Sequence, residues 1–273
     1  MERALKTSML TIAMDTDLTI TGLPAFTDNY LWVLRRQGNA VAVDPGDAAP
    51  IFRHLDSSGE RLTAILITHH HHDHIGGINA LKERFDVPVF GPQRENIAGV
   101  TTQLIGGETI EVPGLDMHFN VLDVGGHTLG HIAYYRPKVL FCGDALFVLG
   151  CGRLFEGTPA QMAKSLGRIA ALPRDTMVYC AHEYTHYNLP FALGVEPGNN
   201  MLQQRAITLQ EAMKINQPTV PMQLGDELDT NPFLRCNVPE VINAARNFRG
   251  YPLSAAMNQI DTFAALREWR NNV

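Results

Sequence analysis

The sequence predicts an α/β fold with two strand-rich halves, followed by a smaller helical segment. Between residues 18 and 182, short apolar runs bounded by turn residues alternate with helical patterns. After about residue 185 the strand patterns fade and helical patterns replace them. We therefore expect two domains, residues 1–184 and residues 185–273.

The first half of the α/β domain is predicted to be mainly strands, with two helices inserted. Turn signals separate the first apolar runs, with Asp-Asn at 28–29, Gly-Asn at 38–39 and Pro-Gly at 45–46. A helical pattern ends near Gly59, a residue that commonly terminates helices. The expected strands are residues 18–26, 30–36, 40–46, 61–68 and 87–92, and the expected helices are residues 48–59 and 78–85.

The second half repeats strands and then turns helical. Met162, Leu166 and Ile169 recur at helical spacing, which predicts an amphipathic helix over residues 159–172. The expected strands are residues 109–112, 117–124, 131–137, 138–144 and, as the last strand, 176–182. The expected helices of the C-terminal segment are residues 200–217 and 254–270.

The composition excludes several classes of protein. The chain has 273 residues, 45% of them hydrophobic, which is enough for a substantial core. A net charge of −6 argues against nucleic-acid binding, and no run reaches the roughly 18 apolar residues of a membrane span. No secretory signal is recognised, and Cys142 and Cys180 lie in apolar runs as expected for inert core thiols. We expect a cytoplasmic, monomeric enzyme.

The stretch "THHHHDHIGG" at residues 68–77 lies between a predicted strand and a predicted helix. Alternate side chains of an extended chain point to opposite faces, and the next two residues can turn back to the same cavity. The candidate metal ligands are therefore His69, His71, Asp73 and His74. His70 and His72 are expected to pack elsewhere or to face solvent.

Three more candidates follow later apolar strands: His127 in "GGHTLGH", Asp144 in "LFCGDALF" and His182 in "VYCAHEY". Each alone is more often structural, but together they supply the imidazole and carboxylate donors that divalent metals bind. His131 is expected just behind this site. Asp44, in "DPG", is expected to hold a turn and not a metal.

These motifs resemble those of the metallo-β-lactamase superfamily. Within it, "GCGRLFEGT" and "AHEYT" are similar to the hydroxyacylglutathione hydrolase, or glyoxalase II, family. The resemblance runs from "PAFTDNYLWVL" near residue 24 to "LREWRN" near the end. It implies an αββα metallo-β-lactamase sandwich as the catalytic domain and a smaller C-terminal helical domain that completes a glutathione site.

The resemblance also implies a centre of two divalent metal ions. The implied ligands are His69, His71 and His127 for one ion, Asp73, His74 and His182 for the other, and Asp144 as a bridge. Asp73 and Asp144 would act in catalysis through a metal-bound hydroxide. No donor is a thiolate, so the site is not strongly biased to soft metals. Zinc is the expected metal, with iron or manganese left open.

The implied substrate contacts are Arg153, Phe155, Tyr184, Arg267 and Arg270. Phe155 stands where some members have tyrosine, and Asn271 stands where members have aspartate. Without the resemblance, Arg267 and Arg270 would be interpreted as a solvated helix face, because they lie three residues apart. With it, guanidinium groups are suited to the carboxylates of glutathione.

The implied reaction is hydrolysis of S-D-lactoylglutathione to glutathione and D-lactate, which detoxifies methylglyoxal. Two alternatives stay open. One is another enzyme on this fold, such as a lactamase or a persulfide dioxygenase with one iron. The other is a non-catalytic metal-binding protein, for which a broken ligand set is expected.

Overall fold

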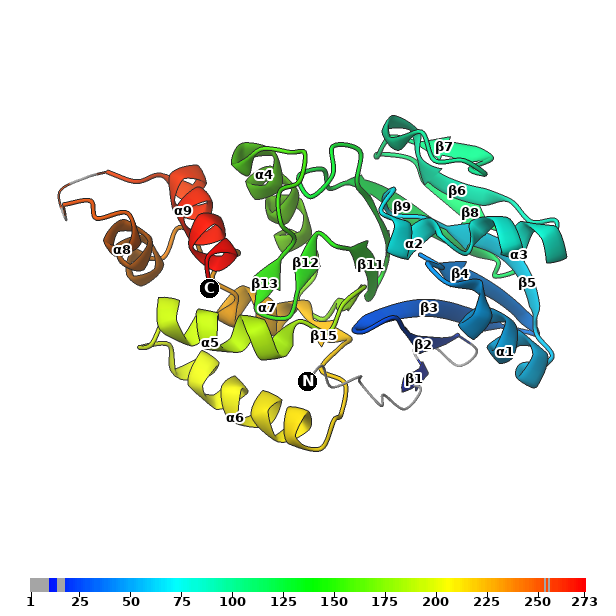
Figure 1. The fold of residues 1–273 in the computed structure, drawn as a ribbon, viewed down its shortest axis with the longest axis horizontal. Coiled ribbons are helices and arrows are strands. Elements are labelled where there is room, and N and C mark those ends of the chain that lie inside the picture. Colours follow the sequence, from blue (N-terminus) through cyan, green and yellow to red (C-terminus); the bar gives the residue numbers. More distant parts are fainter. Residues whose placement is uncertain (1–9, 14–17, 253, 255) are drawn as a thin grey trace.

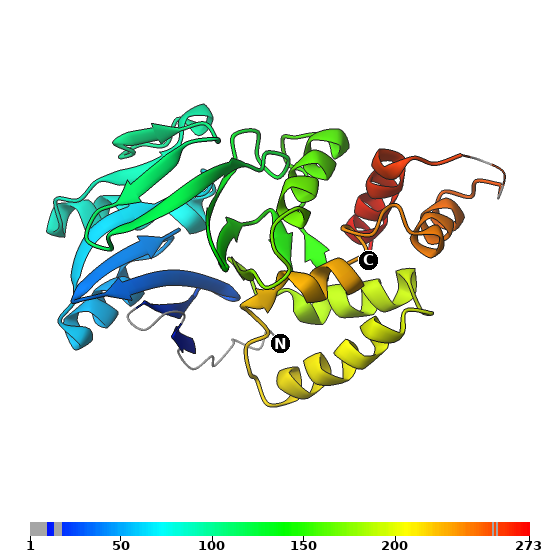
Figure 2. The ribbon, with the colours of Figure 1, turned by 180° about the vertical axis from the view of Figure 1, so that it is seen from behind.

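The computed structural model describes residues 10–13, 18–252, 254 and 256–273. Two β-sheets pack face to face, and most of the helices of the C-terminal segment lie together at one end of this sandwich (Figure 1). Figure 2 shows the same arrangement from behind. No helix in the described part of the chain is long and apolar enough to cross a membrane.

The first sheet has the strand order β1-β2-β3-β4-β5-β6-β7 within the described residues. Its strands are β1 (Leu10–Ala13), β2 (Thr19–Ala25), β3 (Asn29–Arg36), β4 (Asn39–Val43), β5 (Arg61–Leu66), β6 (Val89–Pro92) and β7 (Thr102–Leu104). Neighbouring strands from β1 to β4 pair antiparallel, and neighbouring strands from β4 to β7 pair parallel. The expected strands of this half are confirmed, and β1 and β7 are additional ones.

The second sheet has the order β15-β14-β11-β10-β9-β8. Its strands are β8 (Thr109–Val112), β9 (Met117–Asp123), β10 (Ile132–Arg136), β11 (Val139–Gly143), β14 (Met177–Cys180) and β15 (Met222–Gln223). The short hairpin of β12 (Leu146–Phe147) and β13 (Gly150–Cys151) stands apart. The prediction that residues 176–182 form the last strand is wrong, because β15 pairs with β14.

Two cores explain why the first sheet is apolar on both faces. In β3, Tyr30 and Trp32 belong to the core between the sheets, whereas Leu31 and Val33 belong to a second core. That second core is closed by Ile51 of α1 (Ala48–Ser58) and Leu81 of α3 (Ile78–Arg84). α4 (Pro159–Ala170) packs Met162, Leu166 and Ile169 into the core of the second sheet. The expected αββα layering is confirmed.

The predicted helix end at Gly59 is also confirmed. Gly59 caps α1 in a left-handed conformation with φ of 72°, and its N–H donates to the Leu55 carbonyl oxygen. Glycine adopts this conformation without the Cβ clash that other residues meet.

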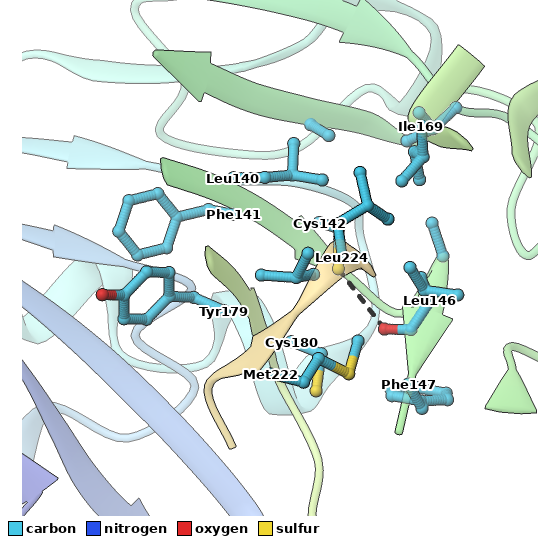
Figure 3. Close-up of a cluster of buried hydrophobic side chains, with 14 of the residues drawn as sticks. Leu140, Phe141, Cys142, Leu146, Phe147, Ile169, Tyr179, Cys180, Met222 and Leu224 are labelled. Carbon is cyan, nitrogen blue, oxygen red and sulfur yellow. Dashed lines mark hydrogen bonds between the residues drawn. The ribbon is translucent and has the colours of Figure 1, made fainter. Parts of the chain in front are cut away.

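The strand β15 brings the C-terminal segment into the core of the sandwich. Met222 and Leu224 lie beside Cys180 and Cys142 in the close-up, whereas the rings of Phe141 and Tyr179 lie on the other side of the strands (Figure 3). Cys142 is fully buried there, with its Sγ 3.3 Å from the Leu146 carbonyl oxygen. Burial raises the pKa of Cys142 and Cys180, as expected for unreactive thiols.

The helical segment is richer than the sequence predicted. It contains α5 (Thr185–Val195), α6 (Asn200–Lys214), α7 (Leu224–Thr230), α8 (Pro239–Phe248) and α9 (Gln259–Asn271). Only α6 and α9 were expected, and α9 begins later than predicted because Asn258 caps it in a capping box with Asp261. α5, although it carries Pro190, packs Leu189 and Phe191 into the core.

Candidate metal centre

The candidate ligands meet where strands of both sheets end. His69 and His71 follow β5, and Asp73 and His74 lie on the short α2 (His72–Ile75). The later candidates His127, Asp144 and His182 follow β9, β11 and β14 respectively. The two sheets are joined at this edge, because Ile132 N donates to the Thr68 carbonyl oxygen at 2.9 Å.

Tight backbone approach lets α2 reach the site. A Cβ on Gly46 would lie 1.8 Å from the Asp73 carbonyl oxygen, so only glycine fits there. The "DPG" turn therefore reverses the chain and also allows the backbone of Asp73 to pack directly against Gly46.

His69, His71, His127 and Asp144 form the first of two donor groups, each offering one atom within 4.8 Å of the others. His71 Nδ1 lies 3.1 Å from His69 Nε2 and 3.0 Å from His127 Nε2. Burial lowers the pKa of all three histidines, which favours the neutral imidazole. A neutral imidazole carries a proton on one ring nitrogen and a lone pair on the other. Lone pairs that face one another in this way can bind a cation.

Asp73, His74 and His182 form the second donor group, within the same distance limit. Asp73 Oδ2 lies 3.4 Å from His182 Nε2 and 3.7 Å from His74 Nε2. Burial opposes protonation of His74, yet the carboxylates of Asp144 and Asp44 raise its pKa to about 10. The pKa of His182 is likewise well above its ordinary value, since Asp144 outweighs the effect of burial.

Asp144 faces both groups. Its Oδ1 lies 3.4 Å from Nε2 of both His74 and His182, and its Oδ2 lies 3.4 Å from His127 Nε2. Asp144 Oδ1 and His74 Nε2 are buried without a hydrogen-bond partner. Burial of such polar atoms destabilises the fold unless a bound group, such as a cation, contacts them. The donor set therefore fits two divalent cations that share one carboxylate.

Two aspartates that the sequence analysis did not assign to the site support these ligands. Asp44 accepts hydrogen bonds from Thr68 N and Thr68 Oγ1, each at 2.7 Å, and its Oδ2 lies 3.1 Å from His74 Nδ1. Asp28 accepts from His182 Nδ1 at 2.8 Å. Asp44 also accepts a turn bond from Gly46, so the turn prediction for it is correct but incomplete. The signal available was its position at the end of β4, which is parallel to β5.

The other two histidines of the motif are in neither donor group, and His72 is exposed and lines the cavity beside them. His70 lies 2.9 Å from Glu95 and 3.3 Å from Glu156, which links the loop after β5 to two further loops. His131 lies behind the site as expected: its ring stacks on His69 at 4.5 Å, and Asp144 N donates to its Nε2 at 3.2 Å.

A cavity of about 730 Å³ opens beside the two donor groups. The five predicted substrate contacts all line it: Arg153, Phe155, Tyr184, Arg267 and Arg270. The Phe155 ring lies 5.3 Å from the rings of both His71 and His127. The Tyr184 ring stacks on His182 at 4.7 Å, and burial raises the pKa of its phenol to about 12. Sequence reasoning missed Tyr187, which also lines the cavity.

The alternative that the two C-terminal arginines form a solvated face is wrong for Arg267. Arg267 is only 5% exposed, donates to the Cys151 carbonyl oxygen at 2.8 Å and lies over the Phe233 ring. Arg270 donates to Asn188 Oδ1 at 3.3 Å. Burial and then the charges of Arg267 and Arg153 lower the pKa of Arg270, so positive charge is concentrated at this end of the cavity.

Comparison with known proteins places the chain in a family. The metallo-β-lactamase superfamily model matches residues 26–182, and the model of the hydroxyacylglutathione hydrolase C-terminus matches residues 183–273. The hydroxyacylglutathione hydrolase of Dechloromonas aromatica is 50% identical over 264 residues, which cover 93% of this chain and 99% of that protein. The chain belongs to the hydroxyacylglutathione hydrolase family.

Solved structures agree with the fold of this hydroxyacylglutathione hydrolase family member. The BLEG-1 B3 metallo-β-lactamase has a TM-score of 0.61 at 24% identity, covering 79% of this chain and 99% of that one. TTHA1623, solved in a di-iron-bound form, has a TM-score of 0.51 at 27% identity, covering 59% and 90%. The superfamily fold and the two histidine–aspartate groups together indicate a binuclear metal site.

Proposed function

We propose that this protein hydrolyses S-D-lactoylglutathione to glutathione and D-lactate, and so detoxifies methylglyoxal. Its curated relatives carry the name of this thioester hydrolase. The observation that carries the proposal is the pair of donor groups sharing Asp144 beside a cavity lined by three arginines. Neither a lactamase nor a one-iron dioxygenase is favoured by the family match.

In the proposed ligand assignment, one ion would be held by His69, His71 and His127, the other by Asp73, His74 and His182, and Asp144 would contribute to both sites. Zinc is the proposed metal, because the donors are imidazole nitrogens and carboxylate oxygens. When bound, the ions would lower the pKa of water to near neutrality and polarise the thioester carbonyl.

The chain's own groups then bind and orient the substrate. Arg153, Arg267 and Arg270 are proposed to pair with the two carboxylates of glutathione. The Tyr184 phenol stays protonated at neutral pH, so it can donate a hydrogen bond. The leaving thiol has an ordinary pKa of about 8.5, and a thiolate can therefore depart with little help from a general acid.

A combined metal and turnover assay tests the proposal. Purified protein should contain two equivalents of divalent metal and hydrolyse S-D-lactoylglutathione. Glutathione persulfide and a β-lactam, assayed beside it, should turn over far more slowly. Metal-loaded protein that hydrolyses no thioester would favour the non-catalytic alternative.

We predict that Arg270→Ala raises KM for glutathione thioesters by about 10-fold or more, since a charge-assisted hydrogen bond contributes roughly 1.5–3 kcal/mol. kcat and metal content should change little, as measured by steady-state kinetics and metal analysis. Arg267→Ala should raise KM as well and also lower the melting temperature, because the Cys151 carbonyl oxygen loses its donor.

Arg84→Ala is the matched control for both arginine variants. It removes one arginine that pairs with Asp56 on the surface, outside the cavity. It should leave KM unchanged. An unchanged KM in Arg270→Ala would mean that this arginine does not bind substrate.

We also predict that metal binding releases protons at pH 7. The raised pKa values of His74 and His182 mean that both are protonated before metal binds, whereas His69, His71 and His127 are not. Ligand nitrogens must be deprotonated, so His74 and His182 should release protons in addition to those released by metal-bound water, and affinity should fall as pH falls. Calorimetric titration with Zn²⁺ in buffers of different ionisation enthalpy measures the number of protons released; a buffer-independent enthalpy would contradict this release.

The remaining expectations stay predictions. We propose that residues 1–184 are the catalytic domain and residues 185–273 the substrate-binding domain. A monomeric state and a cytoplasmic location are likewise expected, without a nucleic-acid or membrane partner.

A further inference from the structure

The turn between β2 and β3 contacts one half of the metal centre through two adjacent side chains. Asp28 accepts a hydrogen bond from His182 Nδ1 at 2.8 Å. Asn29 Nδ2 donates to Asp73 Oδ2 at 2.9 Å. Both contacted residues belong to the Asp73, His74 and His182 group.

Backbone hydrogen bonds fix this turn against the strand end that carries His182. Glu183 N donates to the Asp28 carbonyl oxygen at 2.9 Å, and Tyr30 N donates to the Ala181 carbonyl oxygen at 2.8 Å. Asn29 and His182 form an isolated antiparallel bridge. The Asp28 carboxylate is thereby held where it fixes both the tautomer and the ring orientation of His182.

The other supporting groups differ from Asp28. His127 Nδ1 donates to the neutral Arg153 carbonyl oxygen at 2.8 Å, and His69 Nδ1 lies 3.1 Å from Thr68 Oγ1. Asp44 contacts both halves of the centre, since it lies against His74 directly and against His69 through Thr68. Among the candidate ligands, all of which the structure describes, the Asp28 carboxylate contacts His182, a member of the Asp73, His74 and His182 group.

We propose that Asp28 is a positioning residue that strengthens metal binding in the Asp73, His74 and His182 half alone, acting through His182. This inference rests on the ligand assignment proposed above. The hydrogen bond at Nδ1 orients the His182 ring so that Nε2 faces the other donors of its group, and the carboxylate charge favours a divalent cation there. Loss of such a supporting carboxylate typically weakens metal binding by about 10–100-fold.

Single-site backgrounds separate the two halves in the test. His71→Ala leaves the Asp73 half as the intact site, and His182→Ala leaves the other half. The Zn²⁺ dissociation constant is measured in each background by competition with a chromophoric chelator, with and without Asp28→Asn. We expect about 10–100-fold weaker binding in the His71→Ala background and a change below about twofold in the His182→Ala background.

Glu60→Gln is the matched control, because Glu60 also lies against a histidine: its Oε2 is 3.4 Å from His54 Nε2. Glu60 lies at the N-terminal end of β5, whereas the metal ligands His69 and His71 follow the C-terminal end of that strand. It should leave both constants unchanged. Circular dichroism confirms folding of each variant.

Two results would overturn the inference: an Asp28→Asn effect below about twofold in the His71→Ala background, or equal weakening in both backgrounds, which would indicate a general structural role. Failure of the ligand assignment looks different, because the unmodified protein would then bind fewer than two equivalents of Zn²⁺. Failure of the proposed function looks different again, because metal-loaded unmodified protein would then hydrolyse no S-D-lactoylglutathione while the effect of Asp28→Asn on metal binding persists.

Discussion

Asp144→Ala should abolish binuclear metal binding and lower kcat/KM for S-D-lactoylglutathione by at least about 10³-fold. The two carboxylate oxygens of Asp144 face both donor groups. Without Asp144, each ion would lose one ligand. The negative charge that reduces the repulsion between the two cations would also be lost. Metal ions contribute several kcal/mol of transition-state stabilisation, and each tenfold in rate corresponds to about 1.4 kcal/mol. Metal analysis and steady-state kinetics on the same preparation measure both losses.

A graded series makes this prediction sharper. Asp144→Asn keeps the side-chain volume but removes the charge, so it should also lose metal while the fold persists. His71→Ala should lose one equivalent of metal and most activity, because it lies in one donor group only. Asp56→Ala, which removes an exposed carboxylate paired with Arg84, should change neither quantity. Full turnover in Asp144→Ala or His71→Ala would refute the ligand assignment.

Glu227→Ala should lower the free energy of unfolding by about 3–5 kcal/mol, as expected when one partner of a buried ion pair is removed. Glu227 is fully buried on α7 and pairs with Arg205. It also accepts hydrogen bonds from Leu149 N and Asn231 Nδ2, each at 2.8 Å. Leu149 lies in the turn of the β12–β13 hairpin with φ of 55°, a conformation that needs this support. Chemical denaturation measures the loss.

The same substitution should raise KM, because the hairpin leads directly into Arg153 at the cavity. Asp226→Ala is the matched control: Asp226 is the exposed acidic neighbour on the same helix, and its loss should cost less than about 1 kcal/mol. If Glu227→Ala were as stable as the unmodified protein, the hairpin would not depend on the helical segment.

Much of the sandwich could be predicted from local patterns. The strand from Tyr30 to Leu34 is apolar on both faces, and the helix at residues 159–170 is apolar on one face. In both, the spacing of apolar residues in the sequence predicts which side chains are buried. The ligand candidates could be found because each follows such a strand. The missed elements lack these signals: α5 has apolar residues around its circumference and a proline at 190, and β15 is two residues long.

The sequence by itself determined an α/β domain followed by helices and the seven candidate ligands, because hydrophobic period and motif spacing are local properties of the chain. The layered sandwich followed from the resemblance of its motifs to a known family. Only the tertiary structure decided that Asp144 faces both donor groups, that Arg267 is buried beside Cys151, and that Asp28 and Asp44 support His182 and His74. These contacts join residues up to 154 positions apart. Such contacts depend on how two sheets and a helical segment close on one another, and no local pattern encodes that closure.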